Sequence, residues 1–176
     1  MKSFIKQLYF NFYMGEIDYV IPSVNVDWEG KLDLREIYSF CKKWLLERKY
    51  DLSENEYHND ETEKGNNIRI KWWAFKKIDD YTRFNIDVIF TGKGLKQVSN
   101  KNHMLVLGNV NIQFESYLER DYENIWAMKP WKKFVREIMD KFVNRGKFER
   151  YHEELKEETL TLRDAVKRFF NAVEYS

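Results

Sequence analysis

The sequence predicts an α+β protein, in which a curved antiparallel β-meander packs with one helix from the N-terminal half and two to three C-terminal helices. Three observations predict this fold. An apolar stripe at helical spacing runs through residues 33–49, strand-like segments with short turns fill residues 50–118, and helical stripes return after Pro130. Short connections favour antiparallel neighbours, and runs of strands followed by helices are typical of the α+β class. The 176 residues are expected to form one domain.

The first third of the chain contains one clear helix. Residues 3–14 suit a helix or a strand, and a strand is slightly favoured because aromatic side chains fit a pleated surface. Residues 16–30 are expected to be extended and loop-like, since Pro22 limits strand pairing. Asp33–Lys49 is predicted to be a helix, with Asp33 as its N-cap and Glu36 placed as in a capping box.

A meander of short strands is predicted next. Turns are expected at Gly65-Asn66-Asn67, at Asp79-Asp80 and at Gly92 and Gly94, where glycine and aspartate favour tight turns. The expected strands are Tyr50–Thr62, Ile68–Ile78, Thr82–Thr91, a short edge strand at Leu95–Val98, and Met104–Leu118 with a possible bulge at Gly108.

The C-terminal third is predicted to be helical. Pro130 fits the first turn of a helix that ends near Gly146, Phe148–Glu158 forms a charged helix, and Thr161 opens a last helix. The order of elements is similar to that of the helix-grip, START-like domains. That resemblance implies an apolar-ligand cavity between the sheet and the helix beginning near Pro130.

The stretch RIKWWAFKKI at residues 69–78 contains the leading candidate site. Side chains alternate between the faces of a strand, so Ile70, Trp72 and Ala74 are expected in the core. The opposite face, extended by the next strand, is the candidate binding surface: Arg69, Lys71, Trp73, Phe75, Lys77 and Arg83. Trp73 and Phe75 are the expected anchors for a protein partner or for self-association.

Single-stranded nucleic acid is the alternative partner for this surface. Bases stack on aromatic rings while cations contact phosphates, and residues 67–101 contain eight basic and three acidic side chains. Two structural explanations compete with binding. The C-terminal helices could cover Trp73 and Phe75, and the acidic segment Asp51–Lys64 could pair with the basic strand.

A second constellation consists of alternate residues in a polar segment, namely Glu54, Glu56, His58 and Asp60. On one face of a strand they would be weak candidates for binding a divalent metal or for acid–base chemistry. The intervening residues are also polar, so an exposed edge strand is the simpler expectation.

Composition limits the remaining classes. The chain has 30 basic and 29 acidic residues, so no global charge attracts nucleic acid or a membrane surface. The single cysteine, Cys41, cannot form an intramolecular disulfide and lies in a helical apolar stripe, as a small core residue would. No nucleotide-binding or hydrolase motif is present. We therefore expect a cytoplasmic, non-catalytic binding protein with no cofactor and no transmembrane segment.

Overall fold

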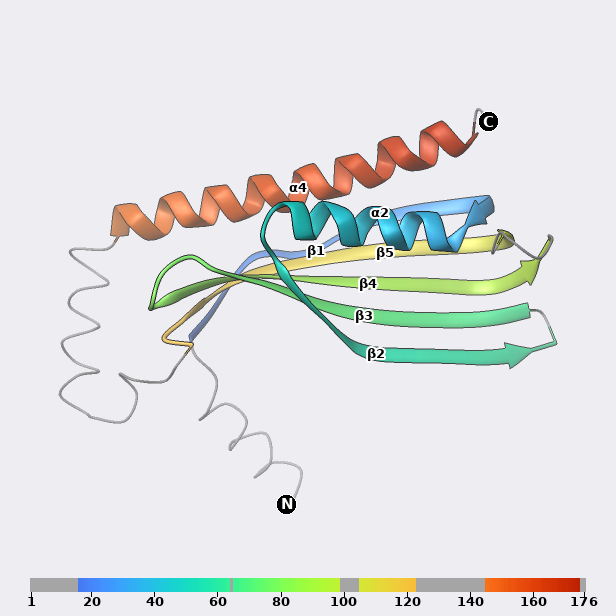
Figure 1. The fold of residues 1–176 in the computed structure, drawn as a ribbon, viewed down its shortest axis with the longest axis horizontal. Coiled ribbons are helices and arrows are strands. Elements are labelled where there is room, and N and C mark those ends of the chain that lie inside the picture. The colour runs from blue at the N-terminus through green and yellow to red at the C-terminus, as the bar shows by residue number, and fades with distance from the viewer. Residues whose placement is uncertain (1–15, 64, 99–104, 123–144, 175–176) are drawn as a thin grey trace, which may run out of the picture.

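The α+β fold is confirmed in a computed structural model that describes residues 16–63, 65–98, 105–122 and 145–174. Figure 1 shows two helices on one side of a five-stranded antiparallel sheet. The elements are β1 (Glu16–Asp33), α2 (Leu34–Glu47), β2 (Asp51–Thr62), β3 (Gly65–Lys77), β4 (Thr82–Gln97), β5 (Leu105–Arg120) and α4 (Arg145–Glu174). The predicted segment 3–14 and the predicted helix from Pro130 lie outside the described residues.

Residues 16–30 are extended, as expected, but the expectation that they form a loop is wrong, because this segment belongs to β1. The strand order is β1-β5-β4-β3-β2, so β1 occupies an edge and pairs with β5. The pairing runs from Glu16 opposite Arg120 to Asp33 opposite Leu105, with register shifts between Tyr19 and Val24. Pro22 lies within that irregular part, and an edge strand tolerates proline because one side of it needs no partner.

Strand β4 is also longer than expected. The turn predicted at Gly92 and Gly94 does not form, and β4 continues to Gln97 in place of a separate edge strand. Glycine instead marks an irregularity in the strand: Gly94 has a φ of 60°, and the register against β5 shifts between Lys93 and Lys96. A bulge with a glycine at positive φ lets a strand bend without ending.

The predicted first helix and its N-cap are confirmed. The Asp33 carboxylate accepts hydrogen bonds from the backbone N–H groups of Arg35, at 2.8 Å, and Glu36, at 3.4 Å. Cys41 is fully buried in the apolar stripe, as expected, and burial raises the pKa of its thiol to about 12. A thiol with so high a pKa is almost entirely protonated at neutral pH and is a poor nucleophile.

The C-terminal helices predicted on either side of Thr161 form one continuous helix, α4. Thr161 does not act as a cap, and Gly146 lies in the first turn of α4 where the sequence had suggested a helix end. The Thr159 hydroxyl donates to the carbonyl oxygen of Leu155 at 2.7 Å, so its polar group is satisfied inside the helix. Buried residues Leu155, Leu162 and Val166 continue the apolar stripe through the predicted break.

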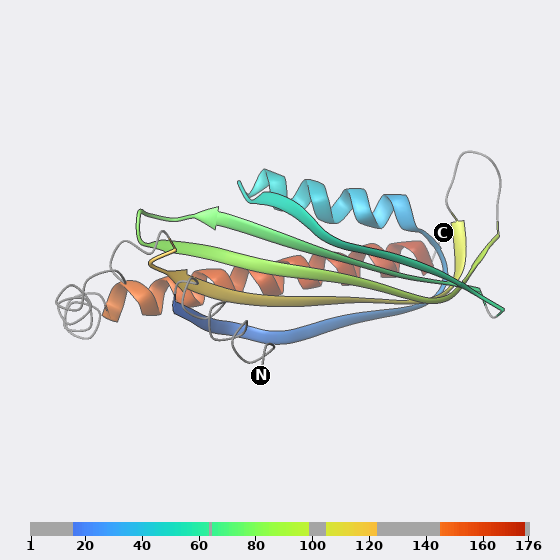
Figure 2. The same cartoon turned by 90° about the horizontal axis from the view of Figure 1, so that it is seen from below.

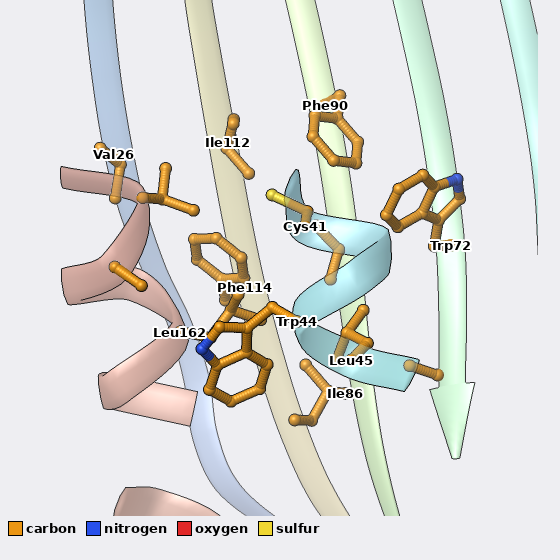
Figure 3. Close-up of a cluster of buried hydrophobic side chains, with 14 of the residues drawn as sticks. Val26, Cys41, Trp44, Leu45, Trp72, Ile86, Phe90, Ile112, Phe114 and Leu162 are labelled. Carbon is orange, nitrogen blue, oxygen red and sulfur yellow. The ribbon is translucent and has the colours of Figure 1, made fainter. Parts of the chain in front are cut away.

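One hydrophobic core lies between the helices and one face of the sheet (Figure 3). It is rich in rings: Trp72 contacts Phe90, with centroids 4.8 Å apart, and Phe40 of α2 contacts Phe169 of α4 at 5.2 Å. The sequence predicted the core face of β3, and Trp72 and Ala74 are indeed fully buried there. In the described part of the chain, no helix is long and apolar enough to cross a membrane.

An ion pair and a hydrogen bond, neither of which the sequence revealed, connect α4 to the sheet. Lys76 of β3 lies on the helix-covered face and pairs with Glu158 of α4, with Nζ and Oε1 2.7 Å apart. The hydroxyl of buried Tyr50 donates to the same carboxylate at 2.5 Å. These bonds satisfy the charged groups of Lys76 and Glu158. Without such partners, partial burial of the two charges would destabilise the folded protein.

Candidate functional site

The predicted binding surface lies together on the face of the sheet opposite α2 and α4. We call it the aromatic–basic face, and it comprises Arg69, Lys71, Trp73, Phe75 and Lys77 of β3 with Arg83 of β4. Figure 2 shows strands of the sheet passing in front of α4, and the core contacts place α2 on the same side as α4, so neither described helix covers this face. The two helices instead pack on the face that carries Trp72, Ala74 and Phe84.

Carboxylates pair with three of the four cations of the aromatic–basic face, namely Arg69, Lys71 and Arg83. Lys71 pairs with Asp87 at 3.0 Å, and Arg69 pairs with Glu56 of β2 at 3.7 Å. Burial lowers the pKa of the Lys71 ammonium, but the hydrogen bond and charge of Asp87 outweigh burial and raise it overall. Paired cations attract phosphate less strongly than free ones, so this geometry gives little support to nucleic-acid binding.

The two rings of this face are engaged within the protein. Trp73 and Phe75 lie with their centroids 4.5 Å apart, and both side chains are half-buried. The indole N–H of Trp73 donates to Asn85 at 2.9 Å, and the guanidinium carbon of Arg83 lies 4.9 Å from the Trp73 ring. These contacts fix the indole in one orientation whether or not a partner binds.

The polar segment of β2 does not place its four candidate residues on one face. A register shift between Glu54 and Glu56 puts Glu54 opposite Trp72 and Glu56 opposite Lys71, which belong to different faces of the sheet. The bulge therefore separates Glu54 from Glu56, His58 and Asp60. No group of three histidine, cysteine or acidic side chains suited to a metal occurs within the described ranges.

A different site lies between α2 and the sheet. We call it the α2 pocket, a cavity of about 360 Å³. It is lined by Leu34, Arg35, Ile37, Tyr38 and Ser39 of α2, Tyr57 of β2, Ile68 and Ile70 of β3, Phe90, Thr91, Gly92 and Leu95 of β4, and Val110 of β5. Its volume falls within the range of roughly 300–1,000 Å³ for small-molecule sites, and most of its lining is apolar.

The pocket lies beneath the first two turns of α2. Farther along the helix, Trp44 and Leu45 are buried against the core and close the space below them. Beneath the first turns, Gly92 contributes no side chain to the floor. A Cβ built on Gly92 would lie 2.5 Å from Leu95 Cδ1, so the Leu95 side chain occupies the adjacent space. The bend in β4 thus helps to shape the pocket floor.

Hydrogen bonds hold one wall of the α2 pocket in place. The Tyr38 hydroxyl donates to Glu54 Oε2 at 3.0 Å, and the Trp72 indole N–H donates to the same oxygen at 3.1 Å. The Tyr38 ring also packs edge-on against Trp72, with centroids 4.5 Å apart. Burial and the interaction with Glu54 raise the pKa of Tyr38, so it remains a neutral donor. The wall is therefore pre-organised before any ligand arrives.

The cavity that the sequence predicted beside the helix beginning near Pro130 involves residues outside the described ranges, and the sequence did not predict the α2 pocket, which uses the first helix. The one local signal was the wide stripe of Leu34, Ile37 and Tyr38, which reads equally well as ordinary core packing. Residues from five elements line the pocket, and their proximity depends on strand pairing across the sheet.

The fold and this cavity define a class: an α+β protein whose open antiparallel sheet and first helix enclose an apolar pocket. No protein family, curated protein or solved structure matches this chain.

Proposed function

We propose that this protein binds a small apolar ligand in the α2 pocket and performs no chemistry on it. The observation that carries the proposal is a cavity of about 360 Å³ between a helix and a sheet, lined mainly by aliphatic and aromatic side chains. Burying apolar surface of a ligand in such a space releases water and favours binding.

Several features support a specific site over a packing defect. The α2 pocket is partly open to solvent, at exposed Arg35, Ser39 and Tyr57, and an apolar concave surface that a ligand can enter is typical of small-molecule sites. Its wall is fixed by the bonds from Tyr38 and Trp72 to Glu54. Tyr57 at its border is 59% exposed, which places an aromatic ring where a ligand can approach from the β2 edge.

The test is calorimetric titration with decanol, a neutral probe with a flexible hydrocarbon chain. We expect saturable 1:1 binding with a negative heat-capacity change, the signature of apolar burial. Ile70→Trp places an indole in the pocket and should remove this binding. Leu46→Trp is the matched control, because Leu46 is 51% exposed on α2 and does not line the pocket. No binding to the wild type, or equal binding to Ile70→Trp, would overturn the proposal.

A protein partner or self-association through the aromatic–basic face is our second candidate. The observation favouring it is that α2 and α4 pack on the sheet face that carries Trp72 and Ala74, which is opposite to the face of Trp73 and Phe75. Tyr19 of β1 adds a ring that is 57% exposed and lies 5.7 Å from Tyr117. Aromatic residues are enriched at interfaces. A very small loss of stability on truncating Trp73 would support this candidate, and a loss as large as that of truncating buried Trp72 would remove Trp73 as an anchor.

A further inference from the structure

Among the described residues, Arg35 is the one cation in the lining of the α2 pocket. It lies in the first turn of α2, its side chain is exposed, and it contributes to the lining beside Leu34 and Ser39. Among the described residues its guanidinium has no ion pair or side-chain hydrogen bond, although its backbone N–H donates to Asp33.

Three less exposed cations of the sheet differ from Arg35 because each has an acidic partner. Lys71 pairs with Asp87, Lys76 with Glu158 and Arg83 with Glu119, each at 3.0 Å or less. These pairs belong to the structure itself, and their charges are already compensated. An unpaired guanidinium at the border of an apolar cavity is free to accept a carboxylate from outside, and its planar fork can bind both carboxylate oxygens at once.

Besides Tyr38, which donates to Glu54, and half-buried Thr91, two exposed residues with hydroxyl groups line the same cavity within the described ranges: Ser39 and Tyr57. Ser39 follows Arg35 by four residues, so the two side chains lie on the same side of α2. Tyr57 contributes a phenol from β2. Neither hydroxyl has a hydrogen-bond partner within the part of the chain that the structure describes. The N-terminal end of a helix also favours negative charge.

Resting on the proposed function, we infer that the ligand of the α2 pocket is an amphipathic monocarboxylate. Its hydrocarbon chain lies on Ile68, Ile70, Phe90 and Leu95, and its carboxylate binds Arg35 at the border of the pocket, within reach of the Ser39 and Tyr57 hydroxyls. The apolar floor selects the hydrocarbon chain, and the unpaired guanidinium of Arg35 selects the charge of the headgroup.

The test compares decanoate with decanol, which differ at the headgroup but share the alkyl chain. Titration calorimetry should show decanoate binding more tightly than decanol to the wild type. Arg35→Gln should weaken decanoate about fivefold to tenfold and leave decanol within about twofold. Lys42→Gln is the matched control, because it removes an exposed cation from the same helix outside the pocket lining. At 0.5 M salt the advantage of decanoate should shrink.

The outcomes separate this inference from the proposed function. If both probes bind and Ile70→Trp removes both, but Arg35→Gln affects neither, the pocket stands and the carboxylate inference is overturned. Equal loss of decanoate binding in Arg35→Gln and Lys42→Gln would also overturn it, since the effect would then reflect overall charge. If neither probe binds the wild type, both proposals fail.

Discussion

The guanidinium of Arg83 pairs with the carboxylate of Glu119 across β4 and β5, with Nη2 and Oε2 2.5 Å apart. Both side chains are largely buried, at 16% and 8% exposure. Arg83 therefore has an internal partner and also lies over the ring of Trp73. In the sequence Arg83 was a candidate to bind a partner. In the structure its contacts with Glu119 and Trp73 link β3, β4 and β5 on the aromatic–basic face.

A double-mutant cycle should detect this pair. Arg83→Met leaves the buried Glu119 carboxylate without its partner and should lower the free energy of unfolding by about 3 kcal/mol. Glu119→Gln should also destabilise, and the coupling energy from urea denaturation should exceed about 1 kcal/mol. The exposed pair of Lys43 and Glu47, with side chains 78% and 59% exposed, is the control. Its coupling should be about 0.3–0.5 kcal/mol. Equal coupling in the two pairs would contradict a structural role for Arg83.

Adjacent tryptophans on opposite faces of β3 should respond differently to truncation. Trp72 is fully buried, so Trp72→Ala should cost about 3–5 kcal/mol of folding stability. Trp73 is half-buried and keeps a hydrogen bond to Asn85 and a stacked neighbour in Phe75. We expect Trp73→Ala to cost about 2 kcal/mol.

Guanidinium denaturation of both variants makes the comparison, and Trp73→Phe is the control that retains a ring. A loss below about 0.5 kcal/mol for Trp73→Ala would indicate a ring kept for a partner. A loss as large as that of Trp72→Ala would identify Trp73 as core and remove it as an interface anchor.

Stability should fall at alkaline pH because of Tyr50. Burial, together with the charge and hydrogen bond of Glu158, raises the pKa of the Tyr50 phenol above its usual value near 10. The unfolded chain loses this proton near pH 10 while the folded protein keeps it. The contribution to stability is thus complete below pH 10 and is lost as pH rises beyond it.

Urea denaturation of the wild type and Tyr50→Phe between pH 7 and 11 checks this expectation. The variant should be less stable by about 1 kcal/mol at pH 7, where it lacks the hydrogen bond to Glu158. The difference should narrow above pH 10, since only the wild type has a phenol to deprotonate at that position. A constant difference across the range would argue against a raised pKa for Tyr50.

Local patterns in the sequence predicted much of the fold. The alternation in β3 placed Trp72 in the core, and the stripe of α2 placed Cys41 there, because burial follows the period of each element. Asp33 was recognisable as a cap from its position alone. The errors concern the ends of elements. Thr161 was predicted to cap a new helix and Gly92 to form a turn, yet α4 continues through Thr161 and β4 continues through Gly92 because tertiary packing favours the longer elements.

The candidate site was less accessible to such reasoning. The members of the aromatic–basic face were correctly placed on one face, but their partners Asp87 and Glu119 come from strand register. A bulge in β2 places Glu54 on the face of Tyr38 and His58 on the opposite face. Such a shift to the opposite face has no recognisable pattern in the local sequence.

By itself, the sequence determined the type of most segments from Asp33 onward and the buried side of α2, β3 and α4, because these properties depend on neighbours within a few residues. Only the tertiary structure decided that β1 is the edge strand beside β5 and that α2 leaves a pocket above Gly92. It also decided that Lys71 and Arg83, near Trp73, pair with carboxylates. Those features arise from contacts between residues far apart in the chain, and their geometry is fixed only when strand register and helix position are set together.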